Sequence, residues 1–87
     1  MRLVLFDQKD FDKIGRKLAS GEEHTFHRTG TDGTRASVEV APAGGCWGEY
    51  NHTDMVATLR ITKGHITTMQ HFANVGDLKR ACREAGV

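Results

Sequence analysis

The sequence predicts an α+β domain in which two helices pack on one face of an antiparallel sheet. Two segments carry apolar residues at helical spacing, four segments between them alternate apolar with polar residues, and short glycine-containing turns join them. The predicted order is β-α-β-β-β-β-α, which gives a sheet of four to five strands in a single domain over residues 1–87.

The first two elements lie within the first twenty residues. Residues 2–6 predict a strand at the edge or centre of the sheet, or an extended segment leading into a helix, because Leu3 to Phe6 are apolar without a break. Asp7 is placed to cap that helix, and Gly21 is a fitting end for it. One face of the helix carries Phe11, Ile14 and Leu18.

A first hairpin is predicted from strands 22–29 and 34–40. A three-residue turn at 31–33 places Phe26 opposite Val38, on the side of the core. A two-residue turn would instead place Phe26 opposite a glutamate. Because a slip of one residue turns every side chain to the other face, the burial pattern favours the longer turn.

A second hairpin is predicted from strands 54–62 and 65–72, with Lys63 and Gly64 as its two-residue turn. This register pairs Ile61 with Ile66 on the core face. The outer face then carries few charges; among its residues are Val56, Thr58, His65, Thr67, Met69 and His71.

A second helix completes the predicted fold. Asn74 is its expected N-terminal cap and Gly86 its expected end. Its apolar face consists of Val75, Leu78, Ala81, Cys82 and Ala85.

The overall charge and the cysteine content exclude several classes of protein. Twelve basic and eleven acidic side chains leave a net charge of +1, so no global field attracts nucleic acid or an anionic membrane. Two cysteines are too few for a disulfide framework, and we expect neither a secretory leader nor a membrane-spanning stretch. We therefore expect a cytoplasmic protein with free thiols.

The segment 41–54 is the most informative for function, because it holds the only Pro, Trp and Tyr of the chain. Long irregular connections in compact domains are often functional, and Trp and Tyr are enriched at binding hot spots. The alternative is that Trp47 closes the end of the core. The predicted partner-binding residues of this segment and of the outer sheet face are Trp47, Glu49, Tyr50, His52, His65, Met69 and His71.

Catalytic and metal signatures are weak. Cys46, His52 and Asp54 are the residue types of thiol catalysis, but no recognisable local sequence surrounds Cys46. His24 and His27 point to opposite faces of a strand, so they cannot bind one zinc ion together. We predict no catalytic residue, no metal site and no cofactor.

A basic patch would arise on the outer faces of the helices if the two helices lie side by side. Its members would be Lys13, Arg16, Lys17, Lys79, Arg80 and Arg83. Such a patch would bind nucleic acid through its phosphates.

The leading functional hypothesis is therefore a non-enzymatic protein-binding domain, an adaptor or inhibitor that covers a partner's surface. In size, self-contained layout and lack of a catalytic signature, the chain is similar to small phage and mobile-element proteins that inhibit host machinery, anti-CRISPR proteins among them. That similarity is one of general character and assigns a role to no residue. The alternatives are a nucleic-acid-binding module that uses the helix patch, and a small enzyme or metal protein centred on Cys46 and His52. A homodimer is a further expectation, since edge strands can add to another sheet.

Overall fold

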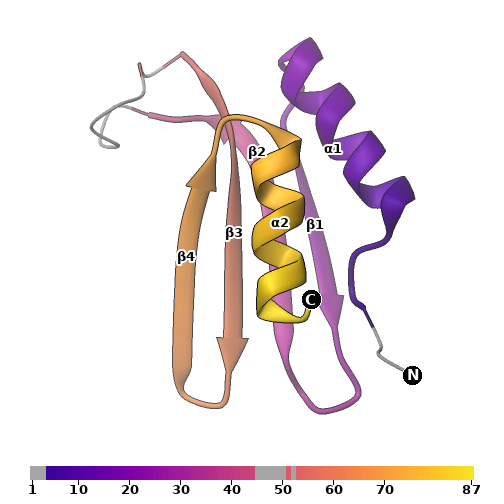
Figure 1. The fold of residues 1–87 in the computed structure, drawn as a ribbon. Coiled ribbons are helices and arrows are strands. Elements are labelled where there is room, and N and C mark those ends of the chain that lie inside the picture. Colours follow the sequence, from indigo (N-terminus) through magenta and orange to yellow (C-terminus); the bar gives the residue numbers. More distant parts are fainter. Residues whose placement is uncertain (1–3, 45–50, 52) are drawn as a thin grey trace.

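The computed structural model, which describes residues 4–44, 51 and 53–87, contains two helices and one four-stranded sheet (Figure 1). The strands are antiparallel, and their order in the sheet follows their order in the chain. The elements are α1 (Gln8–Ser20), β1 (His24–Thr29), β2 (Arg35–Pro42), β3 (Met55–Lys63), β4 (Ile66–Phe72) and α2 (Val75–Ala85). This arrangement confirms the predicted α+β fold with two helices on one face of an antiparallel sheet.

Both helices begin and end at the residues that the sequence indicates. The Asp7 carboxylate accepts a hydrogen bond from the Asp10 N–H at 3.0 Å, and the Asp10 carboxylate accepts one from the Asp7 N–H at 3.1 Å. The Asn74 side chain accepts from the Asp77 N–H at 2.9 Å in the same way. Gly21 and Gly86 end the helices in the left-handed conformation, with φ of 75° and 76°.

The core lies between the helices and the inner face of the sheet. The largest fully buried side chains are Ile14, Val38, Val40, Leu78 and Cys82. They come from both helices and from a central strand, so they join the two layers.

The first hairpin has the predicted register. Phe26 lies opposite Val38, and every predicted pair from His24–Val40 to Thr29–Arg35 is present. Gly33 adopts a φ of 87°, which matches the left-handed position expected in the three-residue turn.

The predicted register of the second hairpin is wrong by two residues. Lys63 lies opposite Ile66, so the turn consists of Gly64 and His65 rather than Lys63 and Gly64. Gly64 has a φ of 61°, whereas His65, like the other described residues that are not glycine, has no positive φ. This is the pattern of a two-residue turn in which glycine is the first residue. A shift of two residues keeps each side chain on its predicted face.

The predicted leading strand is not present. Residues 4–7 lie in no strand of the sheet, and residues 2 and 3 fall outside the described part of the chain. The N–H groups of Leu5 and Phe6 both donate to the Val87 carbonyl at 2.9 Å. These two backbone donors are therefore hydrogen-bonded without pairing to a strand of the sheet. Phe6 is buried, but Val4 is 58% exposed, so the run is not buried on both sides.

Strand β4 lies at the edge of the sheet and is largely open on both faces (Figure 1). Its first five residues are exposed, including Ile66, at 69%. The helices therefore do not cover the whole inner face of the sheet, although the alternation of β4 assigns Ile66, Thr68 and Gln70 to that face.

Candidate binding surface

Neither of the two described helices covers the outer face of the sheet, where side chains of β3 and β4 contact one another (Figure 1). Three cross-strand pairs of side chains meet there. Thr58 Oγ1 lies 2.8 Å from His71 Nδ1, Thr62 Oγ1 lies 3.0 Å from Thr67 Oγ1, and an Arg60 guanidinium nitrogen lies 3.5 Å from Met69 Sδ. We call these six residues the outer strip: Thr58, Arg60, Thr62, Thr67, Met69 and His71.

The outer strip combines one charge with neutral polar and apolar groups. Arg60 is its only charged residue, and Met69 is 45% exposed. Contacts between opposite side chains hold them in defined positions on the pleated surface. The strip is therefore an ordered, nearly neutral surface.

Val56 shares the outer face with Thr58 and Arg60, as the sequence predicts, but it is buried there. Val56 is 3% exposed and lies opposite Ala41. Ala43, also buried, continues the same side, and its N–H donates to the Asp54 carbonyl at 2.8 Å. The outer face is therefore not exposed along its whole length, since Val56 and Ala43 are both buried.

The predicted partner-binding residues are only partly within the described chain. Trp47, Glu49, Tyr50 and His52 lie outside it, as does Cys46. Met69 and His71 both belong to the outer strip, and His65 lies in the turn that precedes the same strand. The structure thus brings two of the predicted residues together and leaves the third at the end of their strand.

The six residues of the expected basic patch are spread over three places. Arg16 and Lys79 line the groove between α1 and α2, and Lys79 and Arg83 line an adjoining groove that also includes Phe6. Arg80 instead faces β4. Lys13 and Lys17 lie towards β1 and the end of α1.

Three of these cations already have partners. Lys17 Nζ lies 2.6 Å from the Glu22 carboxylate, and that hydrogen bond, more than the charge itself, lowers the pKa of Glu22. The Lys13 ammonium lies 5.7 Å from the centre of the Phe26 ring. Lys79 Nζ donates to the Gln8 side chain. The helices therefore lie side by side without presenting the six cations as one surface.

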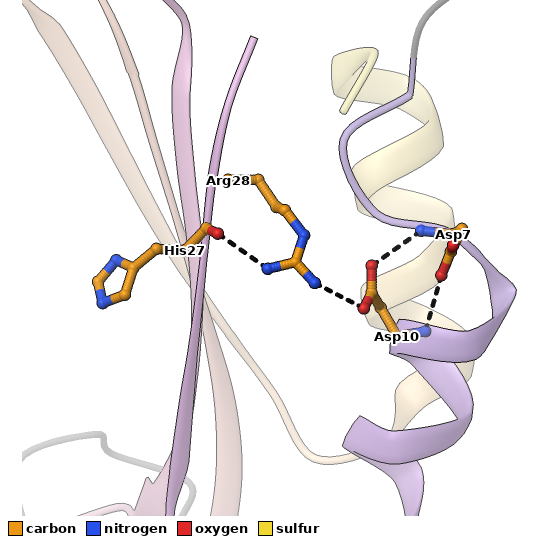
Figure 2. Close-up of polar contacts among 4 residues, drawn as sticks. All are labelled: Asp7, Asp10, His27 and Arg28. Atoms are coloured by element: carbon orange, nitrogen blue, oxygen red, sulfur yellow. Dashed lines mark hydrogen bonds and ion pairs between the residues drawn. The ribbon is translucent and has the colours of Figure 1, made fainter.

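The most connected charged cluster joins α1 to β1 (Figure 2). Arg28 donates to the Asp10 carboxylate at 2.7 Å and to the His27 carbonyl at 2.8 Å, and its guanidinium lies 5.7 Å from the Phe6 ring centre. Asp10 also closes the cap of α1 with Asp7 (Figure 2). The charged groups of this cluster bind one another, so the cluster stabilises the packing of α1 against edge strand β1. The His27 ring points away from it, to the outer side of the sheet (Figure 2).

Cys82 is a buried thiol on the inner face of α2, and its burial raises its pKa to about 11. A thiol in this state is a poor nucleophile at neutral pH. In a Cys46→Ser background, we expect Cys82 to react with a disulfide reagent only when the protein unfolds. Rapid labelling of the folded protein would contradict this placement.

The same burial makes stability depend on pH. Since the folded-state pKa lies above the ordinary thiol value of 9.0, the unfolded state loses its proton first, and stability falls as pH rises from about 9 to 11. Thermal unfolding across this interval should therefore show a smaller loss in Cys82→Ala than in the parent protein. Equal losses would show that other groups control the alkaline limit.

A groove between β4 and α2 was not expected from the sequence. Its volume is about 530 Å3, and its lining residues are Gln70, Phe72, Asp77, Arg80, Ala81, Glu84 and Ala85. The one sequence signal that could have indicated it is the absence of large apolar residues at Thr68 and Gln70 of β4, which leaves nothing for a helix to cover.

Among the described residues, no group of three or more His, Cys, Asp or Glu side chains is arranged to hold a metal ion. Within the same residues, no helix has the length and apolar character needed to cross a membrane. Comparison with protein-family models, curated proteins and solved structures finds no match to this chain.

Proposed function

We propose that this chain is a non-enzymatic protein-binding domain, an adaptor or inhibitor that acts in the cytoplasm by covering part of a partner protein's surface. The observation that supports it is the outer strip, in which opposite side chains already contact one another. Side chains that are ordered before binding lose less conformational entropy when a partner arrives. An inhibitor of this kind, such as a small phage protein directed against host defence, needs no catalytic group.

The character of the strip favours a protein as the partner. Its single cation offers little to a phosphate backbone, whereas its hydroxyl groups and the exposed Met69 thioether suit the mixed polar and apolar surface of a protein. The nucleic-acid hypothesis would need the helix cations, which are divided among separate places.

The experiment compares one substitution on two sides of the molecule. Arg60→Glu reverses the only charge of the outer strip, and Arg83→Glu makes the same change on exposed α2. Tagged proteins are used to capture partners from the native cell, and binding is then measured with the purified partner. We expect Arg60→Glu to weaken binding by about tenfold or more and Arg83→Glu to leave it unchanged.

Circular dichroism spectra should match the parent protein for both variants, since both arginines are exposed. Affinity for the purified partner should change little between low and moderate salt, in contrast to the steep loss typical of phosphate binding. Loss of binding in Arg83→Glu alone, with a steep salt dependence, would overturn the proposal in favour of the nucleic-acid hypothesis.

A further inference from the structure

A groove with an apolar floor runs between α1 and α2, on the side of the sheet opposite the outer strip (Figure 1). It continues into the adjoining groove, because Gln8, Phe11 and Lys79 line both. The two volumes are about 510 and 300 Å3. The larger apolar side chains along this path are Val4, Phe6, Phe11, Val75, Cys82 and Val87.

Part of this floor is in contact with solvent. Val4, which lines the adjoining groove, is 58% exposed, and Ala19 and Gly76 are exposed at the other end of the path. Removing apolar surface from water is favourable. The combined groove can therefore gain free energy by accepting an apolar ligand.

The two helices approach each other closely at Gly15, although the packing does not require a glycine there. A Cβ atom at this position would lie 3.5 Å from Val75 Cγ1, which is an ordinary van der Waals contact. The φ of Gly15 is not positive, and a glycine inside a helix is less favourable than alanine. The absence of a side chain leaves the groove narrow but unobstructed. Such a groove admits a single unbranched chain better than the side-chain ridge of another helix.

Two cations lie one helical turn apart at the adjoining groove. Lys79 and Arg83 both line it, and their spacing of four residues places them on the same side of α2. The exposed Arg83 guanidinium makes no ion pair or hydrogen bond in the part of the chain that the structure describes, and Lys79 donates to the neutral Gln8 side chain. Asp7 also lines this groove, but its carboxylate accepts from the Asp10 N–H in the helix cap. The apolar path thus has a positively charged region.

We propose that the combined groove binds a fatty acid, independently of the outer strip. The carboxylate would lie at Lys79 and Arg83, and the alkyl chain would follow the floor past Phe11. Charge complementarity favours the carboxylate, whose two oxygens can accept from both cations. The alkyl chain has no polar group that needs a hydrogen-bond partner, so the apolar floor suits it along its whole length.

Other occupants fit this groove less well. An acidic peptide in extended form would bring backbone N–H and C=O groups that an apolar floor cannot pair. A second copy of the chain would need an apolar ridge. The exposed large apolar residues of the described chain are Val4, Ile66 and Met69, and Ile66 and Met69 lie on opposite faces of β4. These three residues therefore do not form one ridge.

The test titrates the purified chain with sodium dodecanoate below its critical micelle concentration, by isothermal titration calorimetry. We expect one saturable site with a Kd of the order of 10 μM. Decanoate should bind roughly three- to tenfold more weakly, because two fewer CH2 groups are buried. Dodecylammonium has the same chain with the opposite charge and should bind at least about tenfold more weakly than dodecanoate. Acetate, which is the head group alone, should not bind.

Two arginines of α2 provide a matched pair of variants. Arg83→Glu reverses a charge of the proposed site and should weaken dodecanoate binding by about tenfold or more. Arg80→Glu makes the same change on the same helix, but Arg80 lines the groove beside β4, so binding should stay within about twofold of the parent protein. Equal binding of dodecanoate by the two variants would overturn the proposal.

Gly15→Leu fills the groove with a side chain and should abolish binding. The variant should still fold, and its melting temperature should not fall, because leucine favours a helix more than glycine does. Circular dichroism of the parent protein should be unchanged by dodecanoate, since the ligand enters an existing groove. Binding that accompanies unfolding, or that survives in Gly15→Leu, would overturn the proposal.

Nuclear magnetic resonance locates the ligand without a variant. The amides of Phe11, Gly15, Val75 and Lys79 should shift on addition of dodecanoate, whereas that of Met69 in the outer strip should not. A dimer of the parent protein that Gly15→Leu removes would instead assign the groove to a second copy of the chain. Arg83→Glu is expected to be neutral in partner capture, so the failure of either proposal is distinguishable from the failure of the other.

Discussion

Replacing Leu78 by alanine should lower the free energy of unfolding by about 3 kcal/mol, because it leaves a cavity between α2 and the sheet. Leu78 is 0% exposed and belongs to the main apolar cluster. In a domain of this size, that loss corresponds to a melting temperature lower by about 12–24 °C. Urea and thermal unfolding of purified Leu78→Ala measure the effect.

Val4→Ala is the control for this truncation. Val4 is 58% exposed and lies outside the helices and strands, so its truncation should change the free energy of unfolding by less than about 0.5 kcal/mol. A similar loss in both variants would mean that Leu78 does not join α2 to the core.

Replacing Asp10 by alanine should lower the free energy of unfolding by about 1.5 kcal/mol, because it removes two interactions at once. Its carboxylate accepts from the Asp7 N–H in the cap of α1, and it pairs with Arg28 of β1. The pair is partly exposed, which reduces its contribution. Thermal unfolding of Asp10→Ala measures the loss, expected as about 6–12 °C in melting temperature.

Asp12→Ala is the matched control, because Asp12 lies on the exposed face of the same helix and accepts only from the Gln8 side chain among the described hydrogen bonds. Its effect should stay below about 0.5 kcal/mol. Arg28→Leu should cost less in the Asp10→Ala background than in the parent protein. Equal costs in the two backgrounds would show that Asp10 and Arg28 do not interact.

The elements and their limits follow from local patterns in the sequence. Asp7 and Asn74 have short side chains that can accept from the first turn of a helix, and Gly21 and Gly86 can adopt a positive φ at its end. The register of the first hairpin could be predicted because its two alternatives differ by one residue. The rejected register would have placed Glu39, in place of Val38, on the buried face opposite Phe26.

The second hairpin shows where this reasoning ends. Its two candidate registers differ by two residues, so both place Ile61 and Leu59 on the inner face and both are equal in burial pattern. Gly64 can occupy either position of a two-residue turn, so the turn residues do not choose between them. Only the packing of β4 against the complete sheet selects the observed pairing.

The leading segment and the binding surface depend on contacts between distant parts of the chain. An apolar run such as residues 3–6 is compatible with a strand, yet Leu5 and Phe6 donate to Val87, at the other end of the sequence. The outer face was correctly expected to carry Thr58, Met69 and His71. The groove beside β4 was not, because it depends on how far α2 reaches across the sheet.

The hydrogen bonds from Leu5 and Phe6 to Val87 also set an order for folding during synthesis. The four strands are neighbours in the sheet in the order in which they leave the ribosome, so the sheet can pair progressively. Helix α1 emerges first, but the segment that leads into it receives its acceptor only with residue 87. The nascent chain therefore carries Phe6 and the apolar face of α1 incompletely buried until α2 has been made, and this interval is when chaperones would have most to bind.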